Sequence, residues 1–231
     1  MTTLTVLQPG YLPWLGFFDQ MRKADVFVLY DDVQFDKHGW RNRNRIKCKH
    51  GLQWLTVPVQ QHGKPRITDV EVDRTKQWTE KHVKTIRQCY AGAPCLEPYI
   101  AELEEVLTQP WRLLADLDVA VIELLASWLG VETNVVRSSE LDVPGGRSER
   151  LVALCRHFAA DRYRSGEAAR AYLDVELFER EGIEVEWQNL NHPVYPQQHG
   201  EFVSHLSALD LILNCGEKSS AVLAAAGELS A

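Results

Sequence analysis

The chain has 231 residues, 45% of them hydrophobic and 25% charged, which is an ordinary globular composition and enough for one large domain or two small ones. Its net charge of −7 is uneven. Residues 1–90 carry 15 Lys and Arg against 9 Asp and Glu, a net +6, and residues 91–231 carry 10 against 23, a net −13. The first part can attract an anion, but the acidic remainder argues against a protein that coats long nucleic acid.

Neither a signal peptide nor a membrane span is predicted. The first residues, MTTLTVLQPG, lack the basic start and apolar core of a signal peptide, and no apolar run approaches the roughly 20 residues that cross a bilayer. We therefore expect a cytoplasmic protein with no membrane partner. The cysteines are odd in number and never spaced C-x-x-C, so we expect reduced, mostly buried thiols at Cys48, Cys89, Cys95, Cys155 and Cys215.

The first 30 residues predict a βαβ unit. Thr3–Leu7 is a short apolar strand that stops at Gln8-Pro9-Gly10, and Phe17–Lys23 has the apolar spacing of a short helix. Val26–Tyr30 (VFVLY) is then a second buried strand. This order of elements favours a parallel sheet with a right-handed crossover.

Two groups of candidate ligand-binding side chains follow these strands. In the loop of residues 8–16, Tyr11 and Trp14 either offer flat faces to a ligand ring or cover the sheet edge. Asp31 and Asp32 come directly after the second strand, where open α/β sheets place ligands. Such a carboxylate pair can hold a magnesium ion or a substrate amine.

Residues 41–45 alternate arginine and asparagine (RNRNR) after Trp40. In an extended chain, a period of two places the three guanidinium groups on one face and the two amides on the other. Guanidinium groups suit bidentate capture of phosphate or carboxylate. The alternative is a solvated charge run on an exposed hairpin. The concentration of Trp, Asn and Arg beside an acidic strand end favours a binding role.

The middle of the chain predicts a small β-hairpin insertion and a helical segment. Ile46–Val59 is typical of a hairpin that turns at His50-Gly51, and Ile67–Val72 of a further strand. Residues 77–130 predict amphipathic helices, inserted in or packed beside a single α/β domain of residues 1–220. These helices are expected from Gln77 to about Gly92, over Tyr99–Leu107 and over Trp111–Leu129.

Two later turns have the features of anion sites. After the strand Thr133–Arg137, a Gly-Gly turn leads into the helix Ser148–Phe158, whose N-terminus offers N–H groups beside Arg147 and Arg150. Alternatively, Ser148 caps this helix and Arg150 solvates its surface. The turn is neither a Walker loop nor a G-x-G-x-x-G motif. A strand at residues 161–164, Ser165-Gly166 and a helix start at residues 167–173 repeat the arrangement.

The last part predicts a strand at Ile183–Trp187, a helix at Ser207–Leu213 and a frayed tail at Ala221–Ala231. The histidines at positions 192, 199 and 205 are spaced by seven and six residues, which suits no single metal site, so no metal ligands are predicted. His192, before Pro193, is either satisfied by the backbone or acts as a general base near neutral pH.

Taken together, several ordered motifs resemble one family. LQPGYLPWLGFFDQM, ADVFVLYDDVQFDKHGWRNRNRIK, WLTVPV, SSEL followed by ERLVALC, YRSGEAARAYLD, HPVYPQ and LSALDLILNCG are similar to the WbqC-like protein family of bacterial surface-polysaccharide and natural-product gene clusters. The resemblance covers nearly the whole chain and implies glycyl or other aminoacyl transfer onto a sugar. Gly10 stands where the family's first motif is expected to have Asn, which weakens the expectation of a ligand contact there. The motif positions carried over are Gln8, Pro9, Tyr11, Trp14, Asp31, Asp32, Arg41, Asn42, Arg43, Arg150, Ser165, Gly166, Tyr172, His192, Tyr195 and Asn214.

The expected fold is α/β, a mostly parallel sheet with flanking helices. Its layout is similar to that of nucleotidyl-transferase-like proteins, which bind ATP at the first loop and at a late Ser-Thr turn. Their H-x-G-H signature is absent, because Trp14-Leu15-Gly16-Phe17 has no histidine. Arginine and lysine would then have to neutralise the phosphates of a nucleotide.

The leading hypothesis is a transferase or ligase that moves an aminoacyl or acyl group onto a small polar acceptor such as an amino sugar, with ATP and magnesium as candidate cofactors. Asp31, Asp32 and His192 are the candidate catalytic residues, and the other motif positions are candidates for binding substrate or phosphate. Expected partners are a nucleotide sugar or an activated amino acid. The alternative is a non-catalytic module that binds tRNA or a phosphopantetheine carrier.

If the sheet is parallel, the late turns should converge with the first loop on one pocket. The acids and arginines could instead form a structural salt-bridge network.

Overall fold

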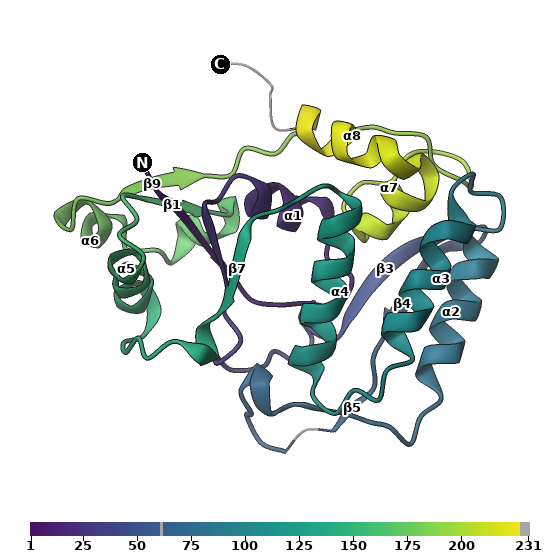
Figure 1. Cartoon of the computed structure of the whole chain (residues 1–231), viewed down its shortest axis with the longest axis horizontal. Helices are drawn as coiled ribbons and strands as arrows, with labels where there is room; N and C mark the ends of the chain where they lie inside the picture. Colours follow the sequence, from purple (N-terminus) through teal and green to yellow (C-terminus); the bar gives the residue numbers. More distant parts are fainter. Residues whose placement is uncertain (61, 227–231) are drawn as a thin grey trace.

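The computed structural model describes residues 1–60 and 62–226. At its centre is a five-stranded parallel sheet in the order β7-β2-β1-β8-β9 (Figure 1). The α/β fold with a parallel sheet is therefore confirmed. The strands are β1 (Thr3–Leu7), β2 (Val26–Leu29), β7 (Asn134–Arg137), β8 (Arg162–Ser165) and β9 (Glu184–Trp187).

The strand order reverses at β1. From this central strand the chain first adds β2 and β7 on one side, and then β8 and β9 on the other. Both neighbours run parallel to β1, since Leu4 pairs with Val26 of β2 and with Tyr163 of β8. In doubly wound sheets of this kind, ligands bind outside the carboxyl ends of the strands at the point of reversal. In this chain that point lies between β1 and β8.

Helices cover both faces of the sheet because side chains along a strand alternate in direction. Leu4 and Val28 belong to a core with α5 (Arg147–His157) and α6 (Val175–Arg180). Phe27 and Leu29 belong to a larger core with α1 (Leu15–Arg22) and α4 (Leu114–Trp128).

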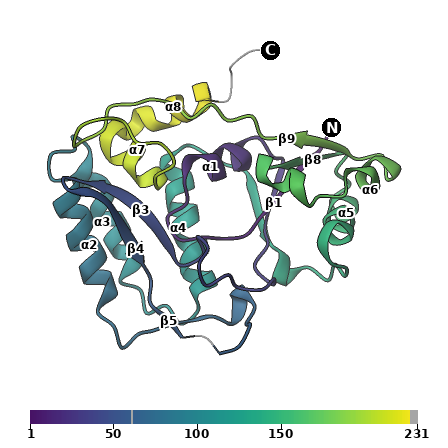
Figure 2. The same ribbon diagram turned by 180° about the vertical axis from the view of Figure 1, so that it is seen from behind.

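A large insertion between β2 and β7 extends the second core. The expected hairpin is present as the antiparallel pair β3 (Arg43–Cys48) and β4 (Gly51–Thr56). It packs beside helices α2 (Trp78–Cys89) and α3 (Leu96–Leu107), which lie at the opposite end of the molecule from α5 and α6 (Figures 1 and 2). The C-terminal helices α7 (Ala208–Cys215) and α8 (Ser219–Ala226) contact α1, α3 and α4.

Three local predictions were wrong. The strand expected at Ile67–Val72 is a 3₁₀ turn, Ile67–Asp69, followed by the two-residue strand β6 (Glu71–Val72), which pairs with β5 (Val59–Gln60). Ile67 and Val70 are both fully buried, an i, i+3 spacing that suits a turn better than a strand. The helix start expected over residues 167–173 is a 3₁₀ helix, Glu167–Ala171.

The third concerns the C-terminus. The part of the expected tail up to Ala226 belongs to α8, because Leu223 and Ala226 pack into the core. The rest of that tail, 227–231, lies outside the described residues.

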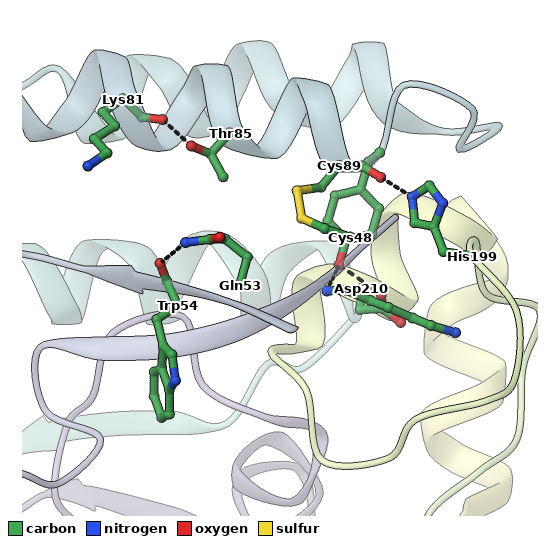
Figure 3. The surroundings of a disulfide bond; sticks show 10 residues. Cys48, Gln53, Trp54, Lys81, Thr85, Cys89, His199 and Asp210 are labelled. Carbon is green, nitrogen blue, oxygen red and sulfur yellow. Dashed lines mark hydrogen bonds between the residues drawn. A yellow bond between two sulfur atoms is a disulfide. The ribbon is translucent and has the colours of Figure 1, made fainter. Parts of the chain in front are cut away.

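The expectation that all cysteines are reduced is also wrong. Cys48 at the end of β3 is joined to Cys89 at the end of α2, with Cα atoms 4.6 Å apart (Figure 3). The bond fastens the hairpin to the helical segment across 41 residues of sequence, which no local spacing rule detects. Cys95, Cys155 and Cys215 are free thiols. Within the described residues, no helix is long and apolar enough to cross a membrane.

Candidate active site

A cavity of about 910 Å³ lies at the reversal point of the sheet. Its floor includes Leu7 and Gln8 at the carboxyl end of β1, and Ser165 and Gly166 at the carboxyl end of β8. The start of α1, the start of α5 and the segment before β3 complete the wall. The first loop and the two late turns therefore meet at one cavity, where sheet topology places ligands.

One wall of the cavity is cationic. Arg41, Arg45 and Arg147 line it, and within the described part of the chain none of them has a carboxylate partner within 4.0 Å. No Asp or Glu is among the described lining residues. By contrast, Arg137 and Arg150, just outside the cavity, are both ion-paired. The wall thus presents guanidinium groups whose charge the protein does not neutralise by direct contact.

Arg41 and Arg45 differ in their surroundings. Burial lowers the pKa of Arg41, and the charges of Asp118 and Asp36 act against this shift. Arg45 lies with its guanidinium carbon 5.4 Å from the ring centre of Trp40, and its Nε has no hydrogen-bond partner in the described structure. Both groups are partly removed from water, which strengthens their attraction for an anion.

The N-terminus of α5 faces the same cavity. Arg147, Ser148 and Leu151, from the first turns of this helix, are lining residues. No side chain caps the helix, and Ser148 Oγ instead accepts a hydrogen bond of 3.0 Å from the Asp174 N–H. The alternative in which Ser148 caps its own helix is therefore not what the structure shows. The first-turn N–H groups and the positive end of the helix dipole add to the cationic wall.

Two residues of the wall have unusual backbone angles. Arg147 has a φ of 48° and His205 a φ of 58°, which lie in the left-handed region that residues other than glycine rarely adopt. Such conformations cost about 1–3 kcal/mol each and cluster at ligand sites. The surrounding structure holds both residues at the cavity despite this cost.

The other walls are aromatic and apolar. Trp14 lies stacked on His205, with ring centres 4.9 Å apart at an angle of 22°. Tyr172, which is 75% exposed, and the buried Tyr163 and Leu173 also line the cavity. A cavity with flat aromatic walls and unpaired arginines suits a ligand that has a ring and an anionic group.

The acidic pair lies behind the wall and does not line the cavity. Asp31 is fully buried and accepts hydrogen bonds from Arg137 Nε at 2.6 Å and from Ser139 N and Oγ at 2.9 Å each. Arg137 also donates to Asp116 Oδ1 at 2.8 Å. These contacts tie the carboxyl end of β2 to that of β7.

Asp32 is held by Arg150, whose Nη1 donates to Asp32 Oδ1 at 3.0 Å and whose Nε donates to the Val143 carbonyl at 3.0 Å. Burial alone would raise the pKa of Asp32, but hydrogen bonds from Arg150 and Ser138 and the charge of Arg150 outweigh it and lower the pKa. The Arg150 guanidinium lies 5.0 Å from the ring centre of Tyr30, which does line the cavity. The arrangement favours the salt-bridge alternative, in which these acids and arginines support the wall.

Comparison with known proteins agrees with this chain's motifs. The model of the WbqC-like protein family matches residues 8–222. The chain belongs to the WbqC-like protein family. It is also 35% identical over 227 residues to the uncharacterized protein Rv1507c of Mycobacterium tuberculosis (strain ATCC 25618 / H37Rv), covering 95% of this chain and 96% of that protein.

The expected binding positions of this WbqC-like protein divide into two groups. One group lines the cavity and consists of Gln8, Trp14, Arg41, Ser165, Gly166 and Tyr172. The other group lies outside it. Tyr11 is fully buried with its hydroxyl 3.0 Å from His82 Nδ1, and the Asn42 Nδ2 donates to the Val57 carbonyl at 2.8 Å. Arg43 donates from Nε to the Gly39 carbonyl at 3.3 Å.

Two further motif positions meet at a buried carboxylate. Tyr195 donates to Asp210 Oδ2 at 3.0 Å, and Asn214 Nδ2 donates to the Asp210 carbonyl at 2.7 Å. Tyr90, directly after α2, donates to Asp210 Oδ1 at 2.7 Å. These residues fasten α7 to the helical insertion, which is a structural role outside the cavity.

His192 of the WbqC-like protein supports a neighbour. Its Nε2 accepts a hydrogen bond of 3.1 Å from the His205 N–H, and its Nδ1 lies 3.0 Å from the Pro193 carbonyl, so both ring nitrogens are engaged. Burial lowers the pKa of His192, and the hydrogen bond with the Pro193 carbonyl offsets only part of this shift. Among the described lining residues the imidazole is that of His205 and not that of His192.

Sequence reasoning missed several lining residues: Gln20, Tyr30, Asn44, Arg45, Arg147 and His205 were outside the predicted site set. For Asn44 and Arg45 the signal was present in the alternating RNRNR run. Arg147 was singled out beside the Gly-Gly turn. His205 had no local signal, because its position depends on the return of the C-terminal segment over Trp14.

Proposed function

We propose that this WbqC-like protein binds an anionic, ring-bearing molecule such as a nucleotide or nucleotide sugar in the cavity. We further propose that it uses this ligand to move an aminoacyl or acyl group onto a small polar acceptor such as an amino sugar. One observation carries the binding step: three arginines without a carboxylate partner line the cavity at the reversal point of the sheet, among described lining residues that include no Asp or Glu.

Arg41 and Arg45 are half-buried in the cavity wall, so their guanidinium groups lose part of their hydration without a carboxylate partner. A phosphate group offsets that cost, and the planar fork of arginine matches its oxygens. Arg41 and Arg45 come from the segment before β3 and from β3 itself, and Arg147 comes from the N-terminus of α5. Two separate segments thus supply positive charge to one ligand, which supports a phosphate-bearing molecule.

The transfer step needs a base at the cavity. In this step the acceptor amine attacks the acyl carbonyl carbon, the bond from that carbon to the leaving oxygen breaks, and the electron pair departs with that oxygen. The amine proton then passes to a base. His205 is the imidazole in position to accept it, because it lines the cavity beside Trp14. His192 would act by holding the His205 backbone.

In this proposal the acidic pair supports the cavity wall and does not hold a magnesium ion. The oxygens of Asp31 and Asp32 already accept hydrogen bonds from arginine and serine groups, so they are not free to coordinate a cation. Within the described residues, no cluster of three or more His, Cys, Asp or Glu side chains forms a metal site. In the proposal, arginine side chains contribute the charge that balances the phosphates.

The experiment has a binding arm and a reaction arm. Thermal unfolding is recorded with millimolar ATP, AMP and nucleotide sugars, and we expect a rise in melting temperature that Arg41→Met and Arg147→Met each reduce. The protein is then incubated with ATP, glycine and a nucleotide-activated amino sugar, and mass spectrometry follows AMP, ADP, pyrophosphate and an acceptor mass gain. Absence of any ligand-induced shift would overturn the binding proposal. Binding without turnover over a broad donor and acceptor panel would overturn the transfer step.

A second function, a non-catalytic module for tRNA, is favoured by one surface feature. Trp40 and Trp54 are 44% and 42% exposed and stack with ring centres 5.4 Å apart, and the Arg43 guanidinium lies 4.7 Å from the Trp54 ring centre. Stacking residues beside arginines are typical of single-strand RNA binding. Filter binding of tRNA across a salt series tests it, with Trp54→Ala as the variant. No retention of tRNA at low salt would exclude this function.

A further inference from the structure

A relay of buried amide groups beneath the cavity ends at Gln20. This residue follows Trp14 and Phe17 at intervals of three along the start of α1, and all three line the cavity. The Gln20 side chain is almost fully buried, at 4% exposure, and its Oε1 has no hydrogen-bond partner in the described structure. An unpaired buried carbonyl oxygen is unfavourable, and Gln20 is a lining residue, so this oxygen is a candidate ligand contact.

The neighbours of Gln20 fix which end of its amide is the oxygen. Gln188 Nε2 lies 2.8 Å from the Gly16 carbonyl and 2.9 Å from Asp19 Oδ2, and both of these groups act as acceptors. The other end of the Gln188 amide must therefore be its oxygen, which accepts a hydrogen bond of 3.0 Å from Gln20 Nε2. The remaining atom of the Gln20 amide is then its carbonyl oxygen. The hydrogen-bond partners therefore determine which atom of the Gln20 amide is the nitrogen and which is the oxygen.

The surroundings restrict what this oxygen can accept. A charged ammonium group is disfavoured, because the cavity has three unpaired arginines and no described carboxylate lines it. A neutral N–H or O–H donor remains. Gly166 lies beside the same amide, since a Cβ there would be 3.5 Å from Gln20 Nε2, and Trp14 and Tyr172 are among the aromatic lining residues of the cavity. A flat ring with a neutral N–H group is the ligand class that matches this corner.

We infer that the Gln20 oxygen is a specificity-determining acceptor for the exocyclic amino group of a nucleobase. The inference rests on the proposed nucleotide site and deepens it, because it selects bases that carry an exocyclic amino group, such as adenine and cytosine, over bases that lack this donor. A ligand without the amino group leaves the buried oxygen unpaired, which corresponds to an affinity loss of about tenfold.

Two matched pairs of probes test the inference by isothermal titration calorimetry. AMP is compared with purine riboside 5′-monophosphate, and CMP with pyrimidin-2-one riboside 5′-monophosphate, so each pair differs by the amino group alone. In the wild type we expect the amino member of at least one pair to bind about tenfold more tightly. Gln20→Met should bring that ratio close to one, with the deaminated probe bound as in the wild type. The exposed Gln109, changed to Met, is the matched control and should keep the wild-type ratio.

The outcomes separate the two proposals. If none of the four probes binds the wild type, the nucleotide site itself is wrong and the inference falls with it. If the probes bind but the members of each pair bind equally, or Gln20→Met keeps the wild-type ratio, the role of Gln20 is refuted while the nucleotide site stands. Should Gln20→Met fail to fold, Gln188→Met frees the Gln20 amide to rotate and is expected to lower the same ratio, and an unchanged ratio there refutes the inference.

Discussion

Replacing Arg150 and Arg41 by methionine separates support of the cavity from ligand binding. Both arginines were expected to bind phosphate, but only Arg41 lines the cavity. The side chains of Arg150 and Asp32 are 11% and 15% exposed and form a two-point ion pair. We therefore expect Arg150→Met to reduce stability, and Arg41→Met to reduce ligand binding with little change in stability.

The expected magnitudes follow from the contacts. Breaking a buried ion pair on one side costs about 3–5 kcal/mol, and the residual exposure of Asp32 lowers our expectation to about 3 kcal/mol. In a chain of this length, that corresponds to a fall of roughly 6–12 °C in melting temperature. Arg41 makes no side-chain hydrogen bond with described residues, so its loss should change stability by less than about 1 kcal/mol. A ligand at 100 times its Kd stabilises the wild type by about 2.7 kcal/mol, and Arg41→Met should lose most of this.

The pH dependence of the Arg150→Met effect gives a further check. The pKa of Asp32 is lowered in the folded protein, so the stability that Arg150 contributes is present above the unfolded pKa of about 3.9 and is lost as pH falls through the folded pKa. The difference in free energy of unfolding between the wild type and Arg150→Met should therefore be largest at pH 7 and decrease below about pH 4.

The assay is urea and thermal unfolding of wild type, Arg150→Met and Arg41→Met, each with and without a stabilising nucleotide. Arg74→Met is the matched control, because Arg74 is exposed. If Arg150→Met were as stable as the wild type but no longer stabilised by the nucleotide, Arg150 would be a ligand-binding residue. The roles assigned to Arg150 and Arg41 would then be wrong.

Three further substitutions test individual contacts by thermal unfolding. Asp118 is fully buried, its carboxylate oxygens have no described hydrogen-bond partner, and burial raises its pKa well above the usual range against an opposing effect of Arg41. The cost of ionising this carboxyl in the folded protein is absent below the unfolded pKa of about 3.9 and grows as pH rises above it. Asp118→Asn should therefore stabilise the protein at pH 7 and not at pH 3.5, and destabilisation at pH 7 would contradict this. Cys48→Ser opens a loop that the disulfide closes across 41 residues, so it should lower the free energy of unfolding by about 4 kcal/mol. Reduction of the wild type should have the same effect. An unchanged melting temperature would exclude a stabilising role for the disulfide. Gly10→Ala places a Cβ 2.7 Å from the Trp40 carbonyl oxygen and should lower the free energy of unfolding by about 1–3 kcal/mol. If this variant were as stable as the wild type, the segment would be free to move away from the added Cβ.

The sheet could be predicted from sequence to the extent that its strands are short apolar runs between turn signals. Thr3–Leu7 and Val26–Leu29 are such runs, and the intervening helix imposed their parallel pairing. The strand order could not be derived in this way, because it depends on which side of β1 the later strands join. Ile67–Val72 misled for a related reason, since its buried residues are three apart and pack as a turn.

The sequence predicts where the candidate site lies better than it predicts which residues line it. The carboxyl ends of β1 and β8 follow from the topology, and Gln8, Ser165 and Gly166 lie there as expected. The acidic pair could not be assigned, because in sequence a carboxylate that binds a ligand looks the same as one paired with arginine. Its partners, Arg137 and Arg150, are 106 and 118 residues away from Asp31 and Asp32.

The RNRNR run shows how one pattern can serve both purposes. Its alternation is real from Arg43 onward, where β3 begins, and the buried face carries the amides. Asn44 Nδ2 donates to the Leu12 carbonyl at 2.7 Å and fastens the first loop to the hairpin, a bond that an exposed charge run would not form. Arg45 lines the cavity together with Asn44, and the Arg43 guanidinium lies over the Trp54 ring. The amides therefore fix the backbone from which the arginines project, so the asparagines act as positioning residues for the arginines. A charge run with regular polar partners of this kind is distinguishable from a solvated one by the burial of its alternate residues.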